Sequence, residues 1–285
     1  MSEAKNQVQK ELWNSFAGER WTRRQVDIDA MLLPFTQALM EASGLMDSTP
    51  QVVLDVGCGS GETSLLVADL GHTVTGVDIS TSLLALARKR AGDRTNITFL
   101  ESDASDATFN GSFDLLISRF GVMFFDDPQA AFNHLVQQIK PGGRVVFVCW
   151  RPPSENEWVT MPMGVLLSVV EPPAPPPPDA PSPFAFANPE RVTAILEGAG
   201  LIDVRFTPVD AAMPMGSDKG AIQAADFIME VGPAALPIAQ LSPESKAMVR
   251  EKMELEIQPR LDDGHLALGG AIWVVEARKP SGDEI

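Results

Sequence analysis

The sequence predicts an α/β protein in which helices cover both faces of a mostly parallel sheet. Short β-rich runs follow one another through the first half of the chain, at 51–56, 73–78, 96–100, 113–118 and 144–150. Segments with helical spacing of apolar residues separate these runs, at 61–70, 80–91 and 127–139. Strands that alternate with helices indicate parallel pairing, because each parallel connection needs a crossover over one face of the sheet.

Length and charge limit the kinds of partner. The chain has 285 residues, 45% of them hydrophobic, which is enough for one large domain or for a domain with a cap. Its formal net charge of −16 repels polyphosphates and anionic lipid surfaces at long range. No stretch approaches the roughly 20 apolar residues that a membrane-spanning helix needs. We therefore expect a small-molecule partner, and neither nucleic acid nor membrane insertion.

The two cysteines favour a reducing compartment. Cys58 lies in a glycine-rich turn and Cys149 in an apolar strand, so neither indicates a disulfide framework or a metal cluster. The polar start of the chain, Met1 to Glu11, lacks the apolar core of a secretion signal. We expect a cytoplasmic protein without a bound metal.

The first 46 residues are expected to form a helical lid ahead of the core domain, 47–285. Apolar residues recur there at helical spacing: Leu12, Phe16, Ile28, Leu32, Phe35 and Leu39. The pattern predicts one or two amphipathic helices that pack over the sheet.

Two insertions, 151–188 and 211–265, are expected to form the substrate cap. The first combines an apolar stretch, 158–170, with a proline-rich run, 172–183, which cannot make ladder hydrogen bonds and should cross the sheet in an extended form.

Strand and helix signals resume between and after these insertions. Asn188-Pro189 begins a helix in the favoured cap-then-proline order, and a strand follows at 201–209. The second insertion contains two expected helices, 217–231 and 242–257, and a final strand ends near 277.

A glycine-rich turn directly after the first strand predicts a ligand site. The chain reads V-V-L-D-V-G-C-G-S-G from 52 to 61, with Gly57, Gly59 and Gly61 at alternate positions. Glycine lets the backbone turn sharply and approach a ligand where any Cβ would collide with it. In a parallel α/β unit this turn lies at the carboxyl ends of the strands, where ligands bind.

Acidic residues around the turn distinguish two kinds of nucleotide site. The dinucleotide fingerprint G-x-G-x-x-G needs glycine at 62, where this chain has Glu62. Asp55 adds a second negative charge, which suits a cationic or zwitterionic ligand better than a phosphate. Asp78, at the end of the second strand, can accept hydrogen bonds from both hydroxyls of a ribose. A ribose combined with a positive centre matches S-adenosylmethionine.

Five motifs in order carry a resemblance to a known family. They are L-D-V-G-C-G-S-G (54–61), G-V-D-I-S (76–80), S-D-A (102–104), F-D-L-L-I-S-R-F-G-V-M-F-F (113–125) and K-P-G-G-R-V-V-F-V-C-W (140–150). In them the chain resembles the class I S-adenosylmethionine-dependent methyltransferases, and more narrowly their ubiquinone/menaquinone-type small-molecule group. The resemblance implies a Rossmann-like, seven-stranded sheet whose last strand is antiparallel. It also implies methyl transfer to O, N or C of a small, partly apolar acceptor.

The resemblance assigns roles to individual residues. It implies that Asp78 binds the ribose, Asp103 with Ala104 the adenine edge, and the glycine turn the methionine part. Trp21, in W-N-S-F-A-G-E-R-W (13–21), looks like the aromatic residue that closes a lid over the cofactor in related bacterial enzymes. The implied cofactor contacts are Trp21, Asp55, Gly57, Cys58, Gly59, Gly61, Asp78, Ile79, Asp103, Ala104, Ser118, Arg119 and Phe120.

Methyl transfer from a sulfonium makes few demands on side-chain chemistry. It is an in-line displacement at an activated carbon, and positioning alone can supply about 7 to 11 kcal/mol. A general base is optional, although it adds roughly 10² to 10⁴ in rate if the acceptor is a hydroxyl or an acidic carbon.

The three histidines are the natural candidates for such a base. His72 is expected on the sheet edge opposite the ligand crevice, and His134 on a solvated helix position. His265 precedes the last strand, whose start lies on the ligand side if it is antiparallel. We therefore consider a catalytic or substrate-contacting role for His265 beside that of an ordinary turn residue. Cys58 lacks the basic neighbour that a nucleophile needs.

The remaining candidates concern the acceptor. Arg119, at the crevice edge, is a candidate catalytic residue that can hold a substrate carboxylate or pair with an acid such as Asp126. Met123, Phe124 and Trp158 are expected to contact an apolar acceptor, although core packing explains them equally well.

Two other functions stay open at this point. A nicotinamide-dependent oxidoreductase would have to bind its cofactor without the third glycine. A methyltransferase-like accessory protein would hold the cofactor without catalysis. The intact glycine turn and Asp78 argue against a degenerate methyltransferase site. An exposed apolar cap would support a homodimer.

Overall fold

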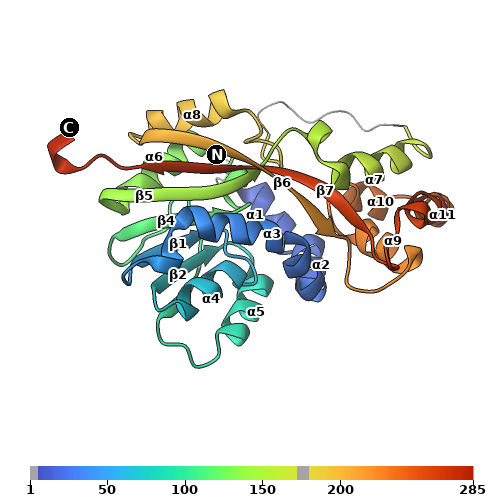
Figure 1. Ribbon diagram of the computed structural model, residues 1–285, viewed down its shortest axis with the longest axis horizontal. Helices are drawn as coiled ribbons and strands as arrows, with labels where there is room; N and C mark the ends of the chain where they lie inside the picture. The colour runs from blue at the N-terminus through green and yellow to red at the C-terminus, as the bar shows by residue number, and fades with distance from the viewer. Residues whose placement is uncertain (1–5, 172–179, 285) are drawn as a thin grey trace.

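A seven-stranded sheet with the strand order β3-β2-β1-β4-β5-β7-β6 forms the centre of the computed structural model, which describes residues 6–171 and 180–284 (Figure 1). The strands are β1 (Val52–Val56), β2 (Thr73–Asp78), β3 (Ile97–Glu101), β4 (Phe113–Arg119), β5 (Ile139–Trp150), β6 (Ile202–Pro214) and β7 (Ala267–Arg278). Neighbouring strands are parallel except at β7, which runs antiparallel to β5 and β6. The predicted fold class is therefore confirmed.

Helices cover both faces because the connection after β1 and the connection after β4 lead toward opposite edges of the sheet. The step from β1 to β2 goes toward one edge of the sheet and the step from β4 to β5 toward the other, so right-handed crossovers place their helices on opposite faces. Figure 1 shows α4 and α5 together at the bottom and α6 and α8 together at the top. These helices are α4 (Glu62–Asp69), α5 (Thr81–Ala91), α6 (Pro128–Gln137) and α8 (Pro189–Gly198).

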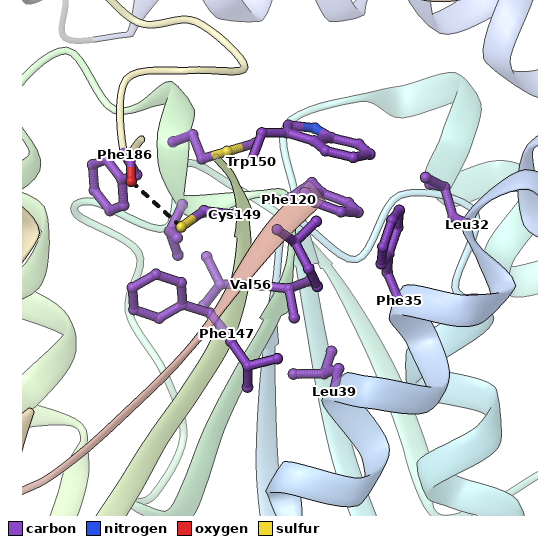
Figure 2. Packing of buried hydrophobic residues seen from close by; sticks show 14 of the residues in the cluster. Leu32, Phe35, Leu39, Val56, Phe120, Phe147, Cys149, Trp150 and Phe186 are labelled. Carbon is purple, nitrogen blue, oxygen red and sulfur yellow. Dashed lines mark hydrogen bonds between the residues drawn. The ribbon is translucent and has the colours of Figure 1, made fainter. Parts of the chain in front are cut away.

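The helix α3 (Gln25–Ser43) packs on the face opposite α6, against β4, β5, β6 and β7. Phe35 of this helix is fully buried and meets Phe120 and Trp150 edge to face, with ring centroids 6.0 and 5.3 Å away (Figure 2). Phe147 points to the other face, where it contacts Phe132 of α6 and Phe186. Because side chains alternate between the two faces of a strand, β5 contributes to the hydrophobic core on each side of the sheet.

The N-terminal segment forms three helices, one more than the upper number expected. They are α1 (Gln7–Trp13), α2 (Phe16–Arg23) and α3. The break after α1 is fixed by tertiary hydrogen bonds that the local pattern does not reveal. The Asn14 side chain donates to the Ile79 carbonyl at 2.8 Å and accepts from the Thr81 N–H at 2.9 Å, which ties α1 to the start of α5.

A cap lies beyond the end of the sheet, at the right of Figure 1. It contains α7 (Glu157–Leu167), α9 (Ala221–Glu230), α10 (Ala235–Ala239) and α11 (Pro243–Ile257), and α11 packs against the other three. The strand β5 pairs with β7 only as far as Trp150. The strands β6 and β7 continue to pair beyond this point, and this two-stranded extension leads into the cap.

Two features of the cap region differ from the expected boundaries. The strand β6 runs to Pro214, so the first four residues of the segment 211–265 belong to the sheet. Most of the proline-rich run, at 172–179, lies outside the described residues. No described helix has both the length and the apolarity that crossing a bilayer requires.

The glycine turn after β1 depends on close backbone contact with the loop after β4. A Cβ on Gly121 would lie 2.5 Å from the Val56 carbonyl oxygen and 2.8 Å from the Gly57 Cα. Gly57 itself has a φ of +69°, a left-handed conformation that favours glycine. Both glycines are therefore needed to seat β1 against β4 at the ligand edge.

We expect Gly121→Ala to destabilise the fold by about 1–3 kcal/mol, because the new methyl group meets backbone atoms that cannot move aside. Urea unfolding measures this loss. Gly164→Ala is the matched control: a Cβ on Gly164, in α7, would have no atom within 4 Å beyond its own stretch of helix, and alanine there should stabilise the helix by up to about 1 kcal/mol. Equal unfolding midpoints for wild type and Gly121→Ala would contradict the packing argument.

Candidate active site

A cavity of about 460 Å³ opens at the carboxyl ends of β1, β2 and β4. The strand ends and the turns that follow them form its floor, as expected for an open α/β sheet. The N-terminal helices form a second wall, and the cap side comes from the loop after α9 and from α10, through residues such as Gly232 and Leu236. The N-terminal helices and the cap helices therefore both contribute to the cavity wall.

The glycine turn and Asp78 form one hydrogen-bonded unit on the cavity floor. Asp78 Oδ2 accepts from the Gly59 N–H at 2.8 Å, and Oδ1 accepts from the Ser80 N–H at 2.8 Å. The Gly57 N–H donates to the Val77 carbonyl at 2.8 Å. Burial raises the pKa of the Asp78 carboxyl, while the hydrogen bonds from the Ser80 and Gly59 N–H groups lower it. The carboxylate is thus held at the end of β2, beside the turn.

Asp55 supports this turn from below and does not line the cavity. It is fully buried, and its Oδ2 accepts from the hydroxyls of Thr63 and Ser64 at 2.6 and 2.5 Å. Burial raises the pKa of the Asp55 carboxyl, and the two hydroxyls lower it. Its position indicates that Asp55 orders the start of α4 under the turn.

A cluster of charged side chains connects the turn with α3. Arg119 forms an ion pair with Glu62 and donates to the Thr36 hydroxyl at 2.6 Å. Asp29 accepts from Arg90 Nη2 at 2.8 Å, and Arg90 Nη1 donates to the Ser60 carbonyl at 3.0 Å. The acidic partner of Arg119 is thus Glu62, not Asp126.

This pairing changes one argument drawn from the sequence. Glu62 faces Arg119 and is absent from the cavity lining, so it does not present an uncompensated charge to a bound phosphate. Burial raises the pKa of the Glu62 carboxyl; Arg119 lowers it and Asp29 raises it. The case against a dinucleotide at this turn rests on the missing glycine.

The residues expected at the adenine edge line the far end of the cavity. Asp103 and Ala104 both contribute to the lining. Asp103 Oδ2 accepts from the Asn6 side chain at 2.7 Å, and the Asp126 N–H donates to Asn6 Oδ1 at 2.6 Å. The start of α1 is therefore anchored to two aspartates over this end.

Aromatic side chains line the part of the cavity between the lid and the cap. Trp21 and Phe124 each meet Trp13 edge to face, at 5.4 and 5.9 Å between ring centroids. Met123 and Trp158 also line the cavity, and the indole N–H of Trp158 donates to the Asn156 side chain at 3.0 Å. This region suits a flat, largely apolar molecule.

The structure brings most of the sequence-predicted site residues to this one cavity. Those that line it are Trp21, Gly57, Cys58, Gly59, Asp78, Ile79, Asp103, Ala104, Arg119, Phe120, Met123, Phe124 and Trp158. Burial raises the pKa of the Cys58 thiol well above its usual range, with Asp78 and Asp55 adding to the effect, which agrees with discounting it as a nucleophile.

Four of the expected site residues do not line the cavity: Asp55, Gly61, Ser118 and His265. Ser118 is buried and donates from its hydroxyl to the Val56 carbonyl at 2.7 Å, so it supports the turn. His265 is exposed in a turn whose backbone pairs with Asp262. Its position outside the cavity lends no support to a role as base or as a substrate contact.

The other two histidines make structural hydrogen bonds. His72 is buried; its Nδ1 accepts from the Gln51 N–H at 3.0 Å and its Nε2 lies 3.0 Å from the Leu45 carbonyl. His134 Nε2 lies 2.8 Å from the Ala107 carbonyl. No histidine of the described chain therefore lines the cavity.

Sequence reasoning missed several lining residues from the lid and the cap. Examples are Trp13, Gln25, Asp29 and Glu230. Trp13 could have been found, because it begins the same W-N-S-F-A-G-E-R-W segment that pointed to Trp21. Asp29 and Glu230 carry no local signal, since only the packing of their helices brings them to the cavity.

Comparisons with known proteins agree with this geometry. Residues 54–147 match a family described as Methyltransferase domain. Demethylmenaquinone methyltransferase from Thermus thermophilus is 32% identical over 141 residues, which cover 48% of this chain and 57% of that protein. Over residues 54–147 the chain therefore resembles a methyltransferase domain, in agreement with the resemblance that its sequence motifs predict.

Two further comparisons cover more of the chain. The 2-methyl-6-phytyl-1,4-hydroquinone methyltransferase of Synechocystis is 30% identical over 191 residues, which cover 64% of this chain and 56% of that protein. The chain thus spans just over half of the length of both curated relatives. The solved structure of Haemonchus contortus phosphoethanolamine N-methyltransferase 2 with S-adenosyl-L-methionine has the same fold, with a TM-score of 0.58 at 19% identity over 95% of this chain and 60% of that one.

Proposed function

We propose that the protein is an S-adenosylmethionine-dependent methyltransferase that acts on a small, partly apolar acceptor. The observation that carries this proposal is the Asp78 carboxylate, held by the Gly59 and Ser80 N–H groups at the edge of a cavity whose floor is a glycine turn. A carboxylate at this point suits the two hydroxyls of a ribose. The family match of residues 54–147 supports the same assignment.

The residues present fit such a cofactor along the cavity floor. Gly57 and Gly59 present no side chain to the cavity, Asp78 would accept from the ribose, and Asp103 with Ala104 lies at the opposite end. When bound, S-adenosylmethionine supplies a methyl group already activated by the sulfonium. Trp21 and Phe124 border the space left for an acceptor.

We further propose that this methyl transfer proceeds without a histidine or tyrosine base. The chain has no tyrosine, and its histidines lie outside the cavity lining. Of the lining carboxylates, Glu230 is paired with Arg24 at 2.8 Å; burial raises the pKa of Glu230, but its hydrogen bonds and charge interactions with Arg24 and Arg23 leave it below the usual value. Alignment and exclusion of water by the lid and cap would then carry the rate enhancement.

A thermal-shift experiment distinguishes this function from its alternatives. S-adenosylhomocysteine at about 100 times its Kd should raise the melting temperature by roughly 5 °C or more, whereas NADH should not. A shift with NADH alone would favour the oxidoreductase. A shift with S-adenosylhomocysteine, but no transfer of labelled methyl from S-adenosylmethionine to any compound of a metabolite extract, would favour the accessory protein.

We also propose a cytoplasmic location, no nucleic-acid partner and a homodimeric assembly. The free thiols of Cys58 and Cys149, both buried, support a reducing compartment, and the net charge of −16 opposes contact with nucleic acid. The cap helices expose Ile222 and Leu255 at 53% and 68%, which favours a dimer contact there. Light scattering during size-exclusion chromatography tests the assembly.

A further inference from the structure

Asn156 occupies the N-cap of α7, but its side chain does not cap that helix. An asparagine at this position ordinarily accepts a hydrogen bond from a backbone N–H of the first turn, which stabilises the helix. Asn188, at the N-cap of α8, does so by accepting from the Glu190 N–H at 2.9 Å. The side chain of Asn156 instead makes its hydrogen bonds outside the first turn backbone of its own helix.

The side-chain amide of Asn156 is fully buried and bonded through both of its polar atoms. Its Oδ1 accepts from the Trp158 indole N–H at 3.0 Å and from the Ala271 backbone N–H at 2.8 Å. Its Nδ2 donates to the Arg151 and Pro152 carbonyls, both at 3.1 Å. One side chain thus connects the Trp158 indole with β7 and with the segment that follows β5.

The indole that Asn156 holds is part of the cavity lining. Its ring centroid lies 4.6 Å from that of Trp150, and Trp150 in turn stacks on Phe120 at 4.2 Å (Figure 2). Asn156 itself does not line the cavity, and among its hydrogen-bond partners in the described chain only Trp158 does. Asn156 can therefore influence a bound molecule through Trp158.

Trp158 also lies against the loop after α9. A Cβ on Gly232 would be 3.1 Å from Cζ3 of the indole, and Gly232 has a φ of +95°, which favours glycine. Val231 and Pro233, on either side of this glycine, line the cavity. A change in the tilt of the indole would therefore displace the cap side of the cavity.

We propose that Asn156 is a positioning residue that fixes the tilt of the Trp158 indole and so shapes the part of the cavity that receives the methyl acceptor. This inference rests on the proposed function, because it needs an acceptor in that part of the cavity. The hydrogen bond restricts both side-chain torsions of Trp158 to one combination. An acceptor then binds to a wall that is already ordered, which lowers the entropic cost of binding.

Transfer of labelled methyl from S-adenosylmethionine to a metabolite extract tests this role. Initial rates over a dilution series of the extract give an apparent KM for the acceptor, and calorimetry gives the affinity for S-adenosylhomocysteine. We expect Asn156→Ala to raise the apparent KM roughly 3- to 10-fold, which corresponds to the cost of ordering one side chain on binding. The affinity for S-adenosylhomocysteine should stay within about twofold of wild type, because the glycine turn and Asp78 are unchanged.

Trp158→Phe separates the hydrogen bond from the rest of the fold. It removes the indole N–H but keeps an aromatic ring, and the bond from the Ala271 N–H to Asn156 stays. This variant should also raise the apparent KM. Adding Asn156→Ala to it should raise the apparent KM no further, because the contact through which Asn156 acts is already absent.

Asn188→Ala is the matched control, since it removes the same amide from the N-cap of another helix. Asn188 is exposed and absent from the cavity lining. Its loss should lower the midpoint of urea unfolding and leave the apparent KM as in wild type.

Four results would overturn the proposal. An Asn156→Ala variant that is less stable but keeps the wild-type apparent KM would assign a structural role alone to Asn156, and a further rise of the apparent KM in the double variant would show that it does not act through the indole. If Asn156→Ala does not fold, an unchanged apparent KM in Trp158→Phe would overturn the proposal by itself. A wild type that transfers no labelled methyl to the extract would contradict the proposed function, and this inference with it.

Discussion

Asp78→Ala is expected to weaken S-adenosylhomocysteine binding by roughly 100-fold or more. In the proposed complex the carboxylate accepts from two ribose hydroxyls, and each charge-assisted bond contributes about 1.5–3 kcal/mol. Alanine removes both bonds, and it also leaves the Gly59 and Ser80 N–H groups without their acceptor. Calorimetric titration with S-adenosylhomocysteine measures the loss of affinity directly.

Two further variants separate loss of a ligand contact from loss of structure. Asp78→Asn keeps an acceptor for one of the two N–H groups but cannot receive two charge-assisted bonds, so its affinity should fall between wild type and alanine, and urea unfolding of both variants measures the structural part of the loss. His265→Ala, on an exposed turn outside the cavity, should bind like wild type. Unchanged affinity in Asp78→Ala would contradict the assignment of the cofactor.

Arg119→Met is expected to lower the free energy of unfolding by about 3–5 kcal/mol at neutral pH. The side chains of Arg119 and Glu62 are each only 11% exposed, and removing one partner of a buried pair leaves an uncompensated charge. Here the charge that stays is Glu62, which also faces Asp29. Urea unfolding followed by circular dichroism measures the loss.

The loss in Arg119→Met should grow as the pH rises. Burial and Asp29 raise the pKa of the folded-state Glu62 carboxyl, and removing Arg119 takes away the main group that lowers it. A folded state that binds the proton more tightly than the unfolded state is stabilised at low pH, and that stability is lost as the pH rises through the folded-state pKa. The variant should therefore lie closer to wild type at pH 5 than at pH 8.

A double variant provides the control for this buried pair. Arg119→Met combined with Glu62→Met replaces both charges by apolar groups, and should recover a substantial part of the stability that Arg119→Met loses. A double variant as unstable as the single one, or a loss that is larger at pH 5, would contradict the role assigned to Glu62.

The sequence was sufficient to predict the sheet and the floor of the site. Strands read as continuous apolar runs because both faces are covered, and the turn after Val56 is marked by glycines that backbone contact requires. That Asp78 lies at the site follows from its place at the end of β2, because the carboxyl ends of parallel strands share one edge of the sheet. These features depend on local pattern and on topology alone.

The walls of the site could not be predicted in the same way. Asp29 and Glu230 reach the cavity only because α3 and α9 pack in a particular orientation, which depends on contacts far away in the sequence. The Asn14 break between α1 and α2 likewise depends on Ile79 and Thr81. For His265, the predicted antiparallel strand is present, but β7 extends beyond the sheet and carries its preceding turn away from the cavity.

The packing of α3 also has a consequence for how the protein is made. Phe35, near the start of the chain, lies against β7, so close that a Cβ on Gly270 would be 2.9 Å from its ring. A ribosome completes α3 long before it completes 267–278. Part of the apolar face of α3 therefore stays uncovered until β7 has been synthesised. Premature termination before β7 would leave that face open to other chains, and aggregation is the expected outcome of such a truncated product.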